Sequence, residues 1–496
     1  MALSSQPCSH IKETIKIHDN YQFEIKQAYN LSLDSRTTNS YFVQTYFFIP
    51  NNLNINRETY SSGDFYKDLR ATIRLQTPAF LLKKLAADID LTDRMRKSIE
   101  DLLASRSRKN ISSYEYHIKM FCLVYKKSIG VQLRFLKKSD RMKEAEHLVS
   151  EFISGAGALI GRFRELKPMI TANSLPGKLQ TVYLFADEYI SIKTETHSCS
   201  LMEILKERHP RLHRKYKRRL MNIINGETSY RMESGYPSIP MQEGDNEKYV
   251  FRQGALKKFL SNILYLETRV ERGGKYLEQA VYSVAAGIAM VFATLVAFIG
   301  QSWYGSLSLP FFIALVISYM FKDRMKESLR LYLNVALHKR LYDRRRNIYH
   351  SFDEKIGTCR ESFNIITDSA VPAKIMEYRS RDSITDINNS MTGENVILYR
   401  KYIRLSSRQF KKIKQRHSAN DVIDIMRFNI QHFLRSMDNP EKKIFIPTQS
   451  GYRKAYGMRV YHINMITCFI VDDMEYLRRF RIILNRNGIR RIEEVL

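Results

Sequence analysis

Residues 297–312 read "AFIGQSWYGSLSLPFF" and lie inside the longest uncharged segment of the chain. No charged residue and no histidine occurs in the 42 residues from Ala280 to Phe321, although the chain carries a formal net charge of +29. A single helix of that length would be about 63 Å long, twice the thickness of the hydrocarbon core of a bilayer. The segment therefore predicts two transmembrane helices, 280–300 and 307–321, joined by a short outside turn at 301–306.

The predicted turn holds Trp303, the only tryptophan of the chain, and Tyr304. Aromatic rings of this kind prefer the headgroup level of a membrane, so we expect both residues to anchor the turn at the interface. Lysine and arginine flank the uncharged segment on both sides and are absent from the turn. The positive-inside rule then predicts a multi-pass protein of the cell (inner or plasma) membrane, with both termini in the cytoplasm. A buried apolar hairpin in a soluble core is the alternative interpretation.

Small residues recur at every fourth position of the two predicted spans. They are Ala285, Ala289, Ala293, Ala297, Pro310, Ala314 and Ser318. Because small side chains let helix backbones approach closely in lipid, these stripes predict packing between the two spans of one chain. A homo-oligomer held together by the same stripes is the alternative. Neither span holds a charged residue, which argues against a transporter.

The remaining sequence predicts an α+β, mainly helical protein. Residues 1–254 predict an N-terminal cytoplasmic domain with a short sheet followed by a helical bundle, and 255–279 predict a juxtamembrane helix. After the spans we expect a cytoplasmic helical extension at 322–365, a linker at 366–393 and a small C-terminal α+β domain at 394–496.

Hydrophobic spacing gives more local predictions. Ile118, Phe121, Tyr125, Ile129 and Leu136 form the apolar stripe of a long helix in the N-terminal domain. In the C-terminal domain, the four apolar residues at 422, 426, 430 and 433 predict a second helix. Asn487-Gly488 is typical of a two-residue hairpin turn, and the final "IRRIEEVL" is compatible with a strand or a helix.

Basic residues concentrate in three stretches of the sequence. They are Lys206, Arg208, Arg211, Arg214, Lys215, Lys217, Arg218 and Arg219 in the first, Arg344, Arg345 and Arg346 in the second, and Arg400, Lys401, Arg404, Arg408, Lys411, Lys412, Lys414 and Arg416 in the third. Because the cytoplasmic leaflet is anionic, these clusters predict binding to a lipid bilayer through its anionic headgroups. A protein or nucleic-acid partner is the alternative, and solvated faces without a ligand are the remaining interpretation.

Signatures of catalysis are sparse. The sequence contains neither a phosphate-binding GxxxxGK[ST] loop nor HExxH, and its five cysteines form no CxxC cluster, so we predict no cofactor and no metal site. The Arg-x4-His spacing of Arg427 and His432 resembles that of HEPN-type ribonucleases, and these two residues are the catalytic candidates that remain. Whether the protein is an enzyme stays open at this point.

Taken together, the sequence favours a membrane-anchored binding or regulatory protein, facing the cytoplasm, that engages an anionic lipid surface or an acidic partner. One alternative is a membrane-tethered hydrolase such as a nuclease. The other is an oligomeric membrane effector.

Overall fold

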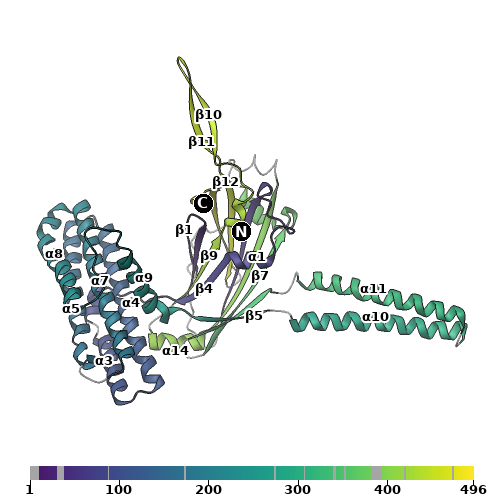
Figure 1. The fold of residues 1–496 in the computed structure, drawn as a ribbon, viewed down its shortest axis with the longest axis horizontal. Coiled ribbons are helices and arrows are strands. Elements are labelled where there is room, and N and C mark those ends of the chain that lie inside the picture. Colours follow the sequence, from purple (N-terminus) through teal and green to yellow (C-terminus); the bar gives the residue numbers. More distant parts are fainter. Residues whose placement is uncertain are drawn as a thin grey trace. The chain divides into compact units, whose positions relative to one another are not determined.

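The computed structural model describes residues 11–30, 38–87, 89–171, 175–272, 275–305, 308–338, 342–350, 354–380, 393–417, 421–471 and 474–495. The protein is α+β, with 54% helix and 31% strand, and the strands form large sheets instead of small sheets at each end. The chain divides into two compact units (Figure 1). The sheet unit comprises Met1–Ile73, Leu266–Gln415 and Asp421–Leu496, and the helical unit comprises Arg74–Tyr265 with Arg416–Asn420.

The sheet unit contains two sheets that face each other across a shared core. The smaller has the strand order β1-β2-β9-β4 and the larger the order β14-β13-β12-β3-β8-β7-β6-β5. The strands are β1 (Ile11–Asp19), β2 (Gln22–Asn30), β3 (Thr38–Pro50), β4 (Leu69–Leu75), β5 (Glu267–Arg272), β6 (Arg344–Tyr349), β7 (Lys355–Ile366), β8 (Glu394–Ser406), β9 (Asp421–Asn429), β12 (Tyr461–Val471), β13 (Met474–Asn485) and β14 (Gly488–Val495). Two further strands, β10 (Glu441–Thr448) and β11 (Gly451–Met458), pair with each other.

Aromatic rings from both sheets fill the core between them. The Phe428 ring of β9 stacks on Phe47 of β3 at a centroid distance of 5.6 Å, and Phe65 of α1 (Ser62–Asp68) lies at the same distance from Phe428. On the other face of the larger sheet, Ile375 of α12 (Ala373–Arg379) packs in a second cluster with Phe48. Alternate residues of β3 therefore serve two different cores, as strand geometry requires.

The order of strands corrects the predicted domain architecture. β3, from the start of the chain, lies between β12 and β8, and β2 pairs with β9 near the other end. An N-terminal sheet domain and a separate C-terminal α+β domain are therefore wrong, because the two ends build the same sheets. Alternation of apolar residues identifies a strand, but it does not identify the strand's partner.

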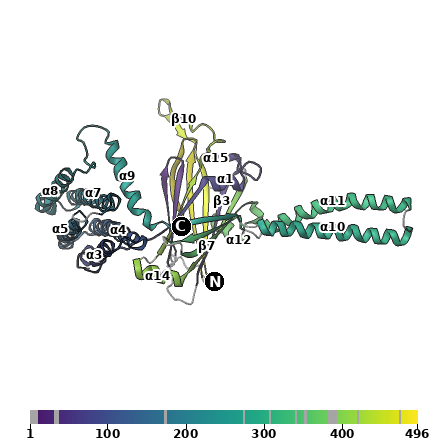
Figure 2. The same cartoon turned by 60° about the horizontal axis from the view of Figure 1, so that its bottom comes forward.

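The helical unit is a bundle that Figure 2 shows nearly end-on. Its helices are α2 (Leu82–Ala87), α3 (Ile89–Ala104), α4 (Arg108–Lys138), α5 (Met142–Arg164), α6 (Lys167–Thr171), α7 (Gly177–Arg208), α8 (Pro210–Glu233) and α9 (Glu247–Ser261), followed by the 3-10 helix η2 (Asn262–Leu264). The predicted apolar stripe of α4 is confirmed, since Ile118, Phe121, Tyr125, Ile129 and Leu136 are all buried.

The uncharged segment forms two antiparallel helices, α10 (Lys275–Tyr304) and α11 (Leu309–His338), which lie side by side (Figure 1). The Arg330 guanidinium of α11 lies 3.7 Å from the centre of the Tyr282 ring of α10. Near the other end of the pair, Gly300 is packed against the ring of Phe311. These two contacts fix the register of α11 along α10.

The prediction of a two-helix transmembrane hairpin is wrong. α11 is uncharged only over the 13 residues Leu309–Phe321, which rise about 20 Å and fall short of the ~30 Å core of a bilayer. The charged residues Lys322 and Arg324 follow within the same helix, and the register places them beside the apolar part of α10. Among the described residues, one helix, Gln279–Trp303, is long and apolar enough to cross a membrane. The predicted multi-pass topology with both termini in the cytoplasm therefore has no support.

Two local predictions in the C-terminal half are also corrected. The helix predicted over 422–433 is mostly the strand β9, followed by the single turn α15 (Gln431–Leu434). The predicted linker 366–393 includes the 3-10 helix η3 (Asp368–Ala370) and α12, while 381–392 lie outside the described residues. A two-residue hairpin turn is present one position earlier than predicted, at Arg486-Asn487, because Asn485 pairs with Gly488, and the residues from Gly488 onward form the strand β14.

Candidate anion-binding site

A cavity of about 380 Å³ lies within the helical unit. It is lined by Arg74, Thr77, Leu123, Lys126, Lys127, Gly130, Arg134, Tyr189, His197, Lys257, Ser261, Leu264 and Tyr265. Five of these residues are lysine or arginine, and none is aspartate or glutamate. The volume is in the range of pockets that bind small organic ligands rather than single ions or water molecules. We call it the cationic cavity.

Helical periodicity places the lining residues of the cationic cavity on one face of each helix that contributes to it. On α4, the lining residues from Leu123 to Arg134 follow one another at steps of three, one, three and four, which keeps them on one face. Tyr189 and His197 lie eight residues apart on α7, and Lys257 precedes Ser261 by four on α9. The three helices contact one another, so their polar stripes converge on one space.

Burial and mutual repulsion shape the electrostatics of this space. Desolvation, followed by the charges of Lys193 and Lys257, lowers the pKa of Lys126 to about 8. Burial and the charge of Arg134 likewise lower the pKa of Lys127, and burial with the charge of Lys257 lowers that of Lys193. Like charges that repel each other without a counterion favour the binding of an anion, which would relieve the repulsion.

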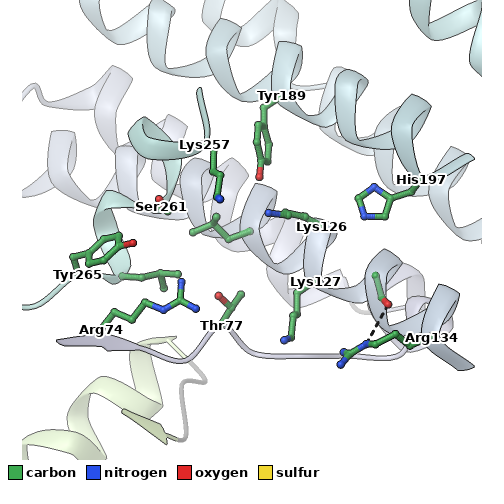
Figure 3. Close-up of a pocket in the computed structure, with 13 residues that line it drawn as sticks. Arg74, Thr77, Lys126, Lys127, Arg134, Tyr189, His197, Lys257, Ser261 and Tyr265 are labelled. Atoms are coloured by element: carbon green, nitrogen blue, oxygen red, sulfur yellow. Dashed lines mark hydrogen bonds between the residues drawn. The ribbon is translucent and has the colours of Figure 1, made fainter. Parts of the chain in front are cut away.

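Two further polar groups face the same space. Tyr189 is 1% exposed, and its hydroxyl has no hydrogen-bond partner among the described residues. Figure 3 shows this hydroxyl turned toward the ammonium groups of Lys126 and Lys257. Burial raises the pKa of Tyr189, so the hydroxyl keeps its proton and offers a donor that only a ligand or water can satisfy.

His197 completes the lining on the side of α7. Its Nδ1 lies 2.6 Å from the carbonyl oxygen of Lys193, which assigns the proton to Nδ1. Burial lowers the pKa of His197, with further lowering by the charges of Lys193 and Lys126. The imidazole is therefore neutral near pH 7, and its Nε2 is a hydrogen-bond acceptor.

The carboxylates of α7 point elsewhere and are neutralised there. Asp187 is fully buried and accepts hydrogen bonds from Arg164 at 3.3 Å and from the hydroxyl of Tyr236 at 2.8 Å. The next residue, Glu188, pairs with Arg252 of α9 at 2.6 Å. Asp187 and Glu188 are thus committed to ion pairs, and no acidic residue lines the cationic cavity.

The first basic cluster of the sequence lies at the end of α7 and on α8. All eight of its residues, Lys206, Arg208, Arg211, Arg214, Lys215, Lys217, Arg218 and Arg219, are exposed. Arg208 pairs with Asp140 at 3.4 Å and Lys215 with Glu146, while Leu212 and Tyr216 face inward. We call the eight residues the α8 basic face.

The second cluster lies on β6, and the third divides between β8 and the helix that follows it, so the residues of these two clusters differ in exposure. Alternation on β6 and β8 turns Arg346 and Lys401 inward, where they pair with Glu361 and Asp424 at nearly zero exposure. Arg344, Arg345 and Arg400 are half-buried, and Arg404, Arg408 and Lys411 are exposed on β8 and α14 (Ser407–His417). The side chains of Lys412, Lys414 and Arg416 lie outside the described residues. Arg346 and Lys401, which the sequence predicts to face an anionic surface, are thus buried in ion pairs.

The catalytic candidates have separate partners. The Nε of Arg427, on β9, donates to Glu24 at 2.8 Å. His432, in α15, is partly exposed, and its Nδ1 lies 2.8 Å from Asp68, which also accepts a hydrogen bond from Tyr60 at 2.9 Å. The structure therefore gives His432 an orienting carboxylate that the sequence did not reveal.

The residues predicted to pack or anchor the spans differ in exposure. Ala285, Ala289 and Ser318 are buried, Ala293, Ala297 and Ala314 are half-buried, and Pro310 is exposed. Trp303 is 76% exposed in the last turn of α10 instead of in a loop, and the side chain of Tyr304 lies outside the described residues.

Sequence reasoning missed every residue of the cationic cavity, because they come from four segments between Arg74 and Tyr265. The available signal was a lysine pair, Lys126-Lys127, set into the most apolar stretch of α4. No group of histidine, cysteine, aspartate and glutamate able to hold a metal ion occurs in the described ranges. Comparisons with protein-family models, with curated proteins and with solved structures find no match to this chain.

Proposed function

We propose that the protein is a binding or regulatory protein whose acidic partner is a small ligand with two or more phosphate groups, held in the cationic cavity. The observation that supports this proposal is the lining itself, which has five lysine and arginine residues and no carboxylate. The hydroxyl of Tyr189, which has no hydrogen-bond partner among the described residues, could donate a hydrogen bond to a phosphate oxygen.

The size of the cavity narrows the ligand class. A volume of about 380 Å³ is larger than one phosphate needs, and the cations come from α4, α9 and the end of β4. A chain of two or three phosphates would reach more than one of these elements at once. Arginine suits bidentate contacts with phosphate, whereas lysine supplies point charges, and the lining holds both.

The test is a titration of the full chain with inorganic pyrophosphate and tripolyphosphate, followed by calorimetry. We expect Lys126→Met to weaken binding by about 10- to 100-fold, because a charge-assisted hydrogen bond contributes ~1.5–3 kcal/mol. Lys178→Met is the matched control, since Lys178 is exposed and does not line the cavity. The proposal would be refuted if both variants lost the same amount of affinity. It would also be refuted if the unmodified protein bound neither probe at millimolar concentration.

Attachment to the cell membrane is the second part of the proposed function. It rests on the length and composition of α10 and on the exposure of its large apolar residues, such as Val291 at 65% and Phe298 at 69%. The exposed α8 basic face would add about 1 kcal/mol of attraction per residue near an anionic leaflet. Alkaline carbonate should leave the protein in the membrane pellet, and Leu295→Arg should release it, because arginine at a helix centre costs ~2.5–3.5 kcal/mol on insertion.

Hydrolysis, as by a nuclease, remains the candidate from another class. The observation that favours it is the Asp68–His432 pair, in which Asp68 holds Nδ1 and leaves Nε2 of a partly exposed imidazole for proton transfer. His432→Ala should abolish the release of nucleotides from a labelled RNA, whereas Arg427→Ala should reduce it less. Unchanged release in His432→Ala would dismiss the residue.

A further inference from the structure

The ribbon formed by β10 and β11 has an unusual surface. Its two strands pair only with each other among the described strands, and almost every residue on them is exposed. Large apolar side chains are among these, with Phe445 at 57%, Tyr452 at 66% and Tyr456 at 70% exposure. Exposed apolar groups gathered on one element indicate an interaction site rather than a core.

The register of the ribbon sorts these residues by face. Lys443 pairs with Tyr456, Phe445 with Lys454, and Pro447 with Tyr452, so all six share one side. The Phe445 and Tyr452 rings are 5.3 Å apart at 83°, and the Lys443 ammonium lies 5.3 Å from the Phe445 ring. We call this side the aromatic face.

The opposite face has a different composition. It carries Ile444 and Ile446 but no ring, together with Lys442 and Arg453. The ribbon thus holds four cations against one acid, Glu441, which lies opposite Met458 at the end of the aromatic face away from the turn. None of the four cations forms an ion pair in the part of the chain that the structure describes.

We propose that the aromatic face binds single-stranded nucleic acid. Exposed bases would stack on Phe445, Tyr452 and Tyr456, while the interleaved Lys443 and Lys454 neutralise phosphates. Rings alternating with cations along an exposed strand pair are the combination used to bind single strands without reading sequence. The proposal is independent of the cationic cavity, which lies in the other unit.

Two competing partners fit the ribbon less well. Insertion into a bilayer needs an apolar tip, but the turn between the strands is Gln449-Ser450, flanked by Thr448. A duplex read through its major groove calls for side chains that hydrogen-bond to base edges, and the aromatic face is built mainly from rings.

The test measures binding of fluorescent dT20 and U20 by the full chain, using anisotropy. Phe445→Ala, Tyr452→Ala and Tyr456→Ala should each raise Kd by about 5- to 100-fold, in line with the cost of losing one stacked base. Ile444→Ala and Ile446→Ala are matched controls, because they remove exposed apolar groups from the other face. Lys454→Ala should weaken binding and flatten its salt dependence.

Several results would overturn the proposal. These are no binding of either oligonucleotide by the unmodified protein, equal loss in the controls, or stronger binding of a 20-base-pair duplex. Ring-dependent binding to phosphatidylserine vesicles with none to dT20 would assign the ribbon to a membrane instead. Circular dichroism and pyrophosphate titration of each variant separate loss of folding from loss of the aromatic face.

Discussion

The Lys126 ammonium lies among other cations, and no carboxylate of the described residues lines its cavity, which has a consequence for the stability of the protein without a ligand. Its pKa of about 8 in the folded state lies below the ordinary value of 10.5, so the unfolded chain binds more protons between these pH values. The contribution of Lys126 to the free energy of unfolding therefore rises as the pH increases from about 8 to 10.5. Below pH 8, Lys126 therefore lowers the stability of the empty protein.

The substitution Lys126→Met tests this destabilising effect directly. We expect the variant to unfold with a free energy about 1 kcal/mol higher at pH 7, less than the full pKa shift implies, because water screens this partly exposed ammonium. The advantage should disappear near pH 10.5. Urea unfolding of the ligand-free chain at the two pH values is the measurement, and Lys178→Met should show neither effect.

Binding of an anion should also change the protonation of Lys126. At pH 8 this lysine is about half protonated when the cavity is empty, and a bound anion raises its pKa. We expect uptake of about half a proton per methanedisulfonate, a probe that does not itself titrate at this pH. Calorimetry in Tris and in HEPES measures the uptake, and identical heats in the two buffers would contradict it.

In the sheet unit, Glu13 makes the stability of the fold depend on pH in the opposite direction. It is buried, it accepts a hydrogen bond from Gln27 at 2.9 Å, and desolvation raises its pKa to about 7. Because the unfolded value is 4.5, stability is full below pH 4.5 and is lost as the pH rises toward 7. Glu13→Gln should remove this loss of stability. At pH 8 we expect the free energy of opening of β1 and β2 to rise by about 2–3 kcal/mol, so that their amide hydrogens exchange more slowly. At pH 4 the two proteins should exchange alike.

At the scale of elements, buried polar residues decide where sequence patterns mislead. On β9 the positions 422, 424, 426 and 428 are buried, with Ile425 buried as well, but one of the alternating positions is Asp424, which pairs with Lys401 inside the core. With an aspartate at that position, Val422 and Met426 are apolar residues four apart, which is the spacing of a helix. The long helix α4 has no such interruption on its apolar face, and its stripe was predictable.

The element α7 joins two opposite environments. One side holds the buried Asp187 with Arg164 and Tyr236, and the other side contributes Tyr189 to the cationic cavity. Asp187→Ala leaves Arg164 with Glu227 alone and two tyrosine hydroxyls without an acceptor. We expect a loss of about 3–5 kcal/mol in the unfolding free energy of the helical unit, measured by urea titration. Asp93→Asn, on α3, is the control and should change stability little.

The whole molecule was the scale least accessible from sequence. The cationic cavity needs four segments to meet, and the sheets need strands from both ends of the chain. Local patterns identify helices and strands. The contacts between these elements, however, join residues that are hundreds of positions apart in the sequence, such as Phe23 and Phe428. The uncharged segment was found correctly, but its second half was too short to span a bilayer.

Two fragments test the division into units. A chain of residues 74–265 should fold as a helical protein and bind tripolyphosphate as the full chain does, because it contains the whole lining. A chain of residues 394–496, the domain expected from the sequence, should stay unfolded, since it lacks β3 between β8 and β12. Circular dichroism and tripolyphosphate calorimetry are the measurements. Cooperative melting of the second fragment would contradict the strand order.

The central place of β3 also matters while the protein is being made. Its apolar segment leaves the ribosome early, but its neighbour β12 is complete only at Val471. At ~5–20 residues per second, the strand waits on the order of 20–80 s without one of its two partners. Both edges of β3 stay unpaired until β8 is complete at Ser406, and one edge stays unpaired after that. Biosynthesis in the cell should therefore depend on a chaperone that shields this strand, which is rich in phenylalanine and tyrosine.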